Sequence, residues 1–147
     1  MPTYDFPRPA LTADVAAFRG APGHREVLLI RRGSPPFEQS WALPGGFVEE
    51  NEPLASAALR ELIEETGLEP LNDLAEVGTY GDPGRDPRGW TVTVLYAVTL
   101  GDEESGAVAG GDDADDAAWY PVGELPALAF DHALLVADAL NKVSFGL

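Results

Sequence analysis

Apolar and polar residues follow two different periods along the chain, and together these periods predict a mixture of strands and helices. In six segments apolar residues alternate with polar ones or form short runs, which is typical of strands. These segments are 11–18, 26–31, 41–43, 75–80, 90–100 and 117–122. Segments 53–66 and 131–143 repeat apolar residues at helical spacing and are predicted to be helices. Strands interleaved with one central and one terminal helix indicate an α/β fold whose sheet is covered on both faces.

The central helix has start and stop signals. Asn51 or Glu52 is in position to cap it, and Pro53 stands in the first turn, where proline is tolerated. Gly67 is expected to end it in the left-handed conformation that glycine adopts easily. Asp131 is expected to cap the terminal helix. At about 100° per residue, the apolar side of the central helix carries Ala55, Ala58, Leu59, Leu62, Ile63 and Thr66.

The other side of the central helix is predicted to carry a group of carboxylates. Glu61, Glu64 and Glu65 fall within an arc of about 100°, and Glu61 and Glu65 lie one turn apart. Clustered carboxylates repel each other, and each raises the pKa of its neighbours. A divalent cation relieves this repulsion, and hard oxygen ligands suit Mg²⁺ or Mn²⁺. Arg60 is expected to pair with Glu52 or Glu64 and to orient the ligands.

A solvated helix whose glutamates serve solubility is the plainer interpretation. The spacing of the surrounding residues argues against it. Segment 46–68 reads Gly, five residues, Glu, seven residues, Arg-Glu-Leu, one residue, Glu-Glu, one residue, Gly-Leu. This pattern resembles the Nudix box of diphosphate hydrolases, with no gap or substitution. The resemblance implies a Nudix-type α/β/α sandwich with a mixed β-sheet, formed by one domain over residues 1–147.

The resemblance also implies roles for individual residues. Glu61 and Glu65 are the first metal ligands it suggests, followed by Glu64 and the carbonyl group of Gly46. The general base stays open among Glu61, Glu64, Asp112 and Asp113, because a base must reach the attacking water and the sequence shows no distances. The catalytic residues implied in this way are Glu61, Glu64, Arg60, Glu52, Asp112 and Asp113.

Motifs outside the box extend the resemblance. The motif Arg85-Asp86-Pro87-Arg88-Gly89, placed ahead of a strand, is similar to a bacterial branch that includes ADP-ribose pyrophosphatases. Arginine suits phosphate recognition, so Arg85, Arg88 and Arg31 are candidate substrate contacts, with plain loop charges as the alternative. Segment 81–89 as a whole reads as an exposed turn-forming loop. The aromatic residues that could contact a base, or simply fill the core, are Trp41, Phe47, Tyr80 and Trp90.

The composition of the chain limits the classes of partner that it is expected to bind. The chain has 25 acidic and 9 basic residues and a net charge of -16, which disfavours nucleic acid. The absence of cysteine excludes disulfides and thiolate metal sites. No apolar run is long enough for a membrane span, and no signal-peptide pattern is present, so a cytoplasmic location is expected. The partner expected is a small-molecule nucleotide, and a homodimer stays open because many Nudix proteins are dimers.

The leading hypothesis is a metal-dependent hydrolase of a nucleoside diphosphate linked to another moiety. The resemblance favours ADP-ribose as substrate, giving AMP and ribose 5-phosphate. Dinucleoside polyphosphates and damaged nucleoside triphosphates such as 8-oxo-dGTP are alternatives within the same enzyme class. A non-catalytic sensor of ADP-ribose or NAD-related metabolites is the alternative from another class. The intact box argues against the sensor, because a sensor need not keep all four carboxylates.

Overall fold

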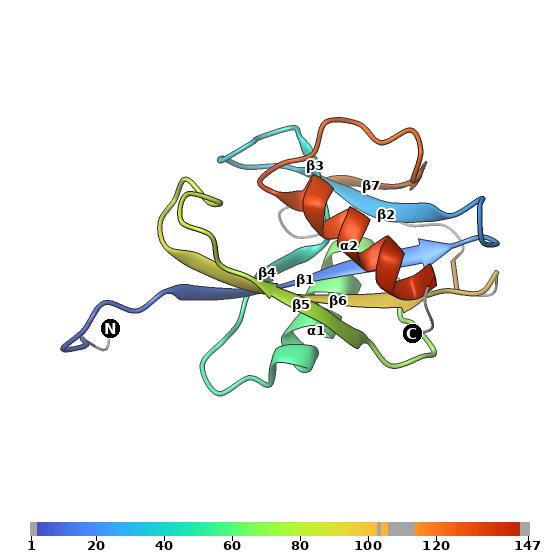
Figure 1. The fold of residues 1–147 in the computed structure, drawn as a ribbon. Coiled ribbons are helices and arrows are strands. Elements are labelled where there is room, and N and C mark those ends of the chain that lie inside the picture. Colours follow the sequence, from blue (N-terminus) through green and yellow to red (C-terminus); the bar gives the residue numbers. More distant parts are fainter. Residues whose placement is uncertain (1–2, 103, 106–113, 145–147) are drawn as a thin grey trace.

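A single mixed sheet of seven strands forms the centre of the computed structural model, which describes residues 3–102, 104–105 and 114–144 (Figure 1). The elements are β1 (Ala10–Arg19), β2 (Glu26–Arg32), β3 (Trp41–Ala42), β4 (Gly45–Phe47), α1 (Leu54–Thr66), β5 (Ala75–Tyr80), β6 (Thr91–Thr99), β7 (Ala114–Pro121) and α2 (His132–Ser144). The strand order is β3-β2-β1-β6-β5, with β4 paired to β1 and β7 to β2. Within the described residues, no helix combines the length and apolar character needed to cross a membrane.

Parallel and antiparallel pairs occur in the same sheet. β1 pairs with β6 in parallel, from Ala10 opposite Thr91 to Phe18 opposite Thr99. β2, β4 and β5 each pair with their neighbours in the antiparallel sense. The parallel pair occupies the centre, where both faces of the strands are covered. The predicted mixed sheet is therefore confirmed.

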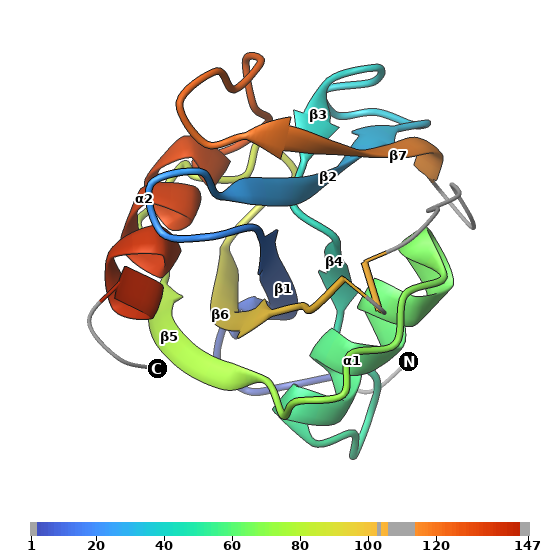
Figure 2. The ribbon, with the colours of Figure 1, turned by 90° about the vertical axis from the view of Figure 1, so that its right-hand side faces the viewer.

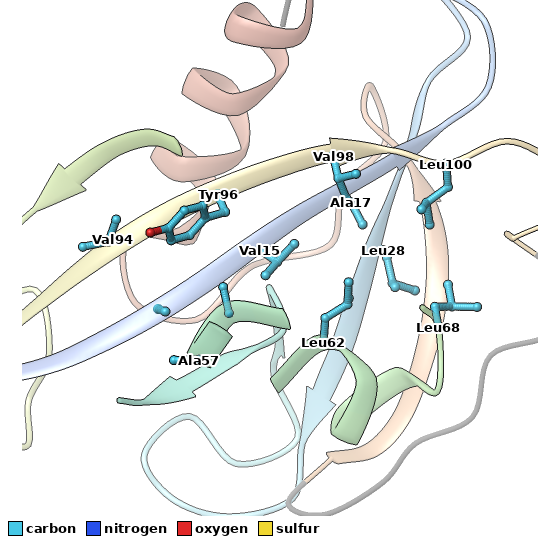
Figure 3. Packing of buried hydrophobic residues seen from close by; sticks show 12 residues of the cluster. Val15, Ala17, Leu28, Ala57, Leu62, Leu68, Val94, Tyr96, Val98 and Leu100 are labelled. Carbon is cyan, nitrogen blue, oxygen red and sulfur yellow. The ribbon is translucent and has the colours of Figure 1, made fainter. Parts of the chain in front are cut away.

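The two helices cover opposite faces of the sheet (Figure 2). Side chains alternate along β1, so Val15 packs with Leu62 of α1, whereas Phe18 packs with Leu135 of α2. Figure 3 shows the first of these clusters, in which Leu62 points from α1 towards the central strands. Burial on both faces explains why the central strands are almost continuously apolar. The α/β/α arrangement predicted from the sequence is confirmed.

The helix starts differ from the prediction. Pro53 takes the cap position of α1 and makes no side-chain cap bond, while Asn51 adopts φ +62°. Glu52 is not available as a cap because its carboxylate accepts hydrogen bonds from Arg60 and from the backbone of Glu49. The predicted end of α1 is present, since Gly67 has φ +78° and donates to the carbonyl of Ile63.

The buried face of α1 is also rotated from the predicted one. Leu59 was expected in the apolar face but is 36% exposed, whereas Glu65 is only 6% exposed. Strand β4, which was not among the predicted strands, packs against α1 and draws this glutamate inwards. The buried residues of α1 are Ala57, Ala58, Leu62, Glu65 and Thr66. The glutamates therefore separate, because Glu64 stays on the exposed side of the helix.

Candidate functional site

A cavity of about 730 Å³ lies between α1, β4, the β5–β6 loop and the segment before α2. Three glutamates of α1 line it, together with both glycines of β4. It is also lined by Arg85, Asp86, Arg88, Phe130 and His132. Segments distant in the sequence thus meet at one place, as is usual for a binding site.

Arg60, which lines the cavity, holds several acidic groups together. Its Nε donates to Glu52 at 2.8 Å, and its Nη1 donates to Glu61 at 2.7 Å and to Glu64 at 3.4 Å. Its Nη2 also donates to the carbonyl of Phe47 at 3.1 Å. The hydrogen bond from Arg60, supported by one from the Glu49 backbone, lowers the pKa of Glu52 to about 2. The predicted pairing of Arg60 with Glu52 and Glu64 is present, and Glu61 joins it.

Glu65 is the most buried carboxylate of the helix. Its Oε1 accepts a hydrogen bond from the backbone N–H of Gly45 at 2.7 Å, which ties α1 to β4. Burial, together with the nearby charges of Glu61 and Asp14, raises the pKa of Glu65 to about 8 despite this bond. A cation in the cavity would favour the ionised form of this carboxyl group.

The two glycines of β4 leave space that the carboxylates fill. A Cβ atom on Gly46 would stand 2.6 Å from the Oε1 of Glu61. A Cβ atom on Gly45 would overlap the carboxylate of Asp14 and lie 2.5 Å from the carbonyl oxygen of Ala13. Glycine at both positions therefore allows carboxylates to reach the backbone of β4.

The carboxylates of α1 have the right chemistry for a hard divalent cation, but they are not gathered into a closed set of ligands. Among residues 3–102, 104–105 and 114–144, no three acidic, histidine or cysteine side chains are grouped to hold a metal ion. Glu61 is hydrogen-bonded to Arg60, Glu65 to Gly45, and Glu64 is largely exposed. The residues fit a metal through their carboxylate oxygen atoms, because those of Glu61 and Glu65 lie against the glycine backbone of β4.

Two residues that the sequence analysis did not assign to the site meet behind β4. Asp14 of β1 is 7% exposed, and its Oδ2 accepts a hydrogen bond from the hydroxyl of Thr93 at 2.6 Å. The Nε2 of His132 lies 3.8 Å from the same oxygen. Burial lowers the pKa of His132, although the charge of Asp14 opposes this. The sequence signal that could have identified Asp14 is a lone carboxylate in a mostly apolar strand.

The rim of the cavity combines aromatic rings with guanidinium groups. Arg88 lies 4.9 Å from the ring centre of Phe47 and 5.5 Å from that of Phe130, and it pairs with Asp86 at 2.8 Å. Arg32 lies 5.0 Å from the ring centre of Phe130 on the same rim. Phe130 has φ +54°, a strained conformation for a bulky residue and one that clusters at functional sites.

The candidate arginines have different surroundings. The side chain of Arg85 is 5% exposed and donates two hydrogen bonds to Asp131, at 2.8 and 2.6 Å. The prediction of an exposed loop was wrong at Arg85 and Asp86, both of which fold against the cavity wall. Asp131 directly precedes α2, as predicted, and its carboxylate accepts the two hydrogen bonds from Arg85.

The remaining candidates lie away from the cavity or outside the described part of the chain. Arg31 does not line the cavity and Arg32 does, since successive residues of a strand point to opposite faces. Asp112 and Asp113 lie outside the residues that the structure describes. Of the aromatic candidates, Phe47 lines the cavity; the others, Trp41, Tyr80 and Trp90, do not.

Known proteins resemble this chain over most of its length. A family model described as NUDIX domain matches residues 9–139. An ADP-ribose pyrophosphatase of Methanocaldococcus jannaschii is 42% identical over 117 residues, which are 79% of this chain and 66% of that protein. The ADPR responsive transcriptional repressor NtrR of Acinetobacter baylyi is 46% identical over 98 residues, which are 65% of this chain and 39% of that protein.

Solved structures resemble the fold as closely. The NUDIX domain of Shewanella oneidensis NrtR complexed with ADP ribose has a TM-score of 0.84 and 34% identity, with 95% of this chain and 94% of that chain covered. A bifunctional NMN adenylyltransferase/ADP ribose pyrophosphatase from Francisella tularensis, complexed with AMP and a Mn ion, has a TM-score of 0.78 and 25% identity. The alignment covers 95% of this chain and 43% of that protein.

Proposed function

Because the chain belongs to the Nudix family, we propose that it is a metal-dependent hydrolase of a nucleoside diphosphate linked to another moiety. The observation that carries the proposal is the cavity in which Glu61 and Glu65 of α1 face the two glycines of β4. ADP-ribose is the substrate that the relatives favour, with AMP and ribose 5-phosphate as products. The chain spans 66% and 39% of the two curated relatives, so their activities support this proposal by similarity alone.

Nudix hydrolases generally use divalent metal ions, and we propose Mg²⁺ for this chain, with Mn²⁺ as the substitute. Glu61 and Glu65 would hold it, with Glu64 and the carbonyl of Gly46 as further ligands. A bound cation would offset charge on the diphosphate and on the transition state. Arg60 would keep Glu61 aimed at the cavity through the bond that the two residues already share.

The reaction would be the attack of water on one phosphorus of the diphosphate. The bond from this phosphorus to the bridging oxygen would break, and two phosphate monoesters would leave. A carboxylate takes a proton from the attacking water, and among the described residues Glu61 and Glu64 are the candidates that line the cavity. Asp112 and Asp113 remain candidates by sequence.

Arg88 and the rings beside it would contact the substrate at the rim of the cavity. The Arg88 side chain is 40% exposed and lines the cavity, so a phosphate or a flat base can reach it. Arg85 lines the same wall, but Asp131 occupies two of its donors. We therefore assign Arg88 to substrate contact and Arg85 to holding the wall in place.

Replacing Arg88 with alanine should raise KM for the true substrate about 10-fold with a smaller change in kcat, because a charge-assisted contact is lost on binding. Arg85→Ala should instead lower the midpoint of thermal unfolding by roughly 5 °C or more, because it leaves Asp131 without its partner. Arg8→Ala, in the exposed segment before β1, is the matched control for loss of one positive charge. An unchanged KM in Arg88→Ala would return this residue to a plain loop charge.

A sensor of ADP-ribose is the second candidate, and the similarity to a transcriptional repressor favours it. A sensor would bind ADP-ribose without turnover, whereas a hydrolase would release AMP. Similarity to a putative 8-oxo-dGTP diphosphatase of Bacillus subtilis, 39% identical over 59 residues, keeps damaged nucleotides among the substrates to be tested.

A substrate panel tests the proposed function. ADP-ribose, diadenosine polyphosphates and 8-oxo-dGTP are each incubated with Mg²⁺, and the products are identified. We expect AMP and ribose 5-phosphate from ADP-ribose, the highest kcat/KM for that substrate, and loss of turnover in excess EDTA. A kcat/KM at least about tenfold higher for 8-oxo-dGTP, about 1.4 kcal/mol in transition-state binding, would overturn the substrate assignment. Full activity in EDTA would overturn metal dependence.

A further inference from the structure

His132 is a buried histidine that the proposed reaction does not use, and it contacts the backbone that leads into β4. Its Nδ1 accepts a hydrogen bond from the backbone N–H of Leu43 at 3.0 Å. A ring nitrogen that accepts such a bond carries no proton, so the ring proton of the neutral form lies on Nε2. This Nε2 faces Asp14, which also accepts a hydrogen bond from Thr93 and lies against Gly45.

The backbone that His132 contacts continues directly to the glutamates. After Leu43, the carbonyl of Pro44 accepts a bond from Val15, and the N–H of Gly45 donates to Glu65. Three consecutive residues are thus held by three elements: α2, β1 and α1. Gly46 follows, with Glu61 filling the space beside it. A shift of Leu43 would therefore move the backbone against which both carboxylates rest.

An apolar residue could fill the volume of His132 but could not accept the hydrogen bond from the N–H of Leu43. Leu43 is 2% exposed, so without His132 its buried N–H would lose the acceptor that it has in the structure. The preceding strand is already held by a bond from Ala129 to the carbonyl of Trp41. The N–H of Leu43 is the point at which the start of α2 reaches the entry to β4.

We propose that His132 is a positioning residue, which holds Leu43 through Nδ1 and so keeps Gly45 and Gly46 in place against Glu65 and Glu61. The metal site at the two glutamates depends on this bond, although His132 is not a ligand itself. The inference rests on the proposed function only in taking these glutamates as the metal site. Loss of a residue that supports ligands in this way typically costs about 10–100-fold in metal affinity or activity.

Two substitutions of His132 distinguish the role of the acceptor Nδ1 from the role of the rest of the ring. In His132→Asn the side-chain oxygen lies as many bonds from Cβ as Nδ1 does, so Leu43 keeps an acceptor. In His132→Gln the polar end matches Nε2 instead, so a donor towards Asp14 remains and the acceptor for Leu43 is lost. Leu134→Gln, at an exposed position in the first turn of α2, is the matched control.

Mn²⁺ affinity, measured by calorimetry, and hydrogen exchange at the Leu43 and Gly45 amides test this without any substrate. His132→Gln should weaken Mn²⁺ binding about 10-fold or more and speed exchange at both amides, while His132→Asn stays within about 3-fold of the unmodified protein. Equal losses in both variants would overturn the assignment to Nδ1, and so would unchanged affinity and exchange in His132→Gln.

The unmodified protein supplies a test that does not depend on how the variants fold. Nitrogen NMR of the His132 ring should show Nε2 protonated and Nδ1 bare, and a proton on Nδ1 would contradict the proposal. If the unmodified protein bound no Mn²⁺, the proposed metal site would fail. In that case unchanged exchange at Leu43 in His132→Gln would still overturn the positioning role, and faster exchange would support it.

Discussion

Glu61→Gln is expected to lower kcat by at least about 10²-fold while the fold stays intact. The carboxylate of Glu61 lies between Arg60, at 2.7 Å, and the backbone of Gly46. Glutamine keeps the size of the side chain and an oxygen that can accept the bond from Arg60, so only the negative charge is removed. That charge is what would hold a divalent cation. Steady-state kinetics at several Mg²⁺ concentrations, with circular dichroism of the same samples, measure the effect.

Glu50→Gln is the matched control for this substitution. Glu50 belongs to the same acidic segment but is exposed and does not line the cavity. Its neutralisation changes the net charge by the same amount and should leave kcat close to that of the unmodified protein. If Glu61→Gln kept the unmodified kcat, Glu61 would not belong to the active site.

Alanine at the two glycines of β4 should have different effects: Gly46→Ala should mainly lower activity, and Gly45→Ala should mainly lower thermal stability. Gly46→Ala places a Cβ against the end of the flexible Glu61 side chain, so this carboxylate would move while the fold adjusts. Activity should fall about 10-fold or more with a small change in thermal unfolding. Gly45→Ala places a Cβ against the backbone of Ala13 as well as Asp14, and backbone cannot move aside cheaply. Its unfolding midpoint should fall by roughly 5 °C or more.

Gly123→Ala is the control for both glycines, because a Cβ at Gly123 would meet no atom within 4 Å. Thermal unfolding followed by circular dichroism, combined with kinetics, separates the two kinds of damage. A Gly46→Ala protein that unfolds as easily as Gly45→Ala would show that the space beside Gly46 serves stability rather than the placement of Glu61.

The features that were predicted correctly depend on short stretches of sequence. The helix of the box, its glycine end and the pairs of Arg60 follow from residues within one or two turns of each other. The strands β1 and β5 follow from patterns within single segments, and β2 follows from a short apolar run. Such local patterns need no knowledge of the rest of the chain.

The features that were missed depend on residues brought together by the fold. Asp14 becomes part of the site because Thr93 and His132 reach it from β6 and α2. Glu65 turns inwards because β4 supplies the N–H of Gly45, and β4 is a strand too short to show a period of its own. Arg85 and Asp131, 46 positions apart, showed no pattern that would have paired them.

The parallel pairing of β1 with β6 sets an order for the assembly of the molecule. The bond between Thr93 and Asp14 joins residues 79 positions apart, and the two strands align along their whole length. Closing so long a stretch costs entropy before any pairing repays it, and such contacts slow folding. During synthesis at the ribosome, β1 leaves the exit tunnel long before β6, with α1 in between. The carboxylates of α1 therefore leave the tunnel early, but the central β1–β6 pair against which α1 packs forms only when β6 arrives.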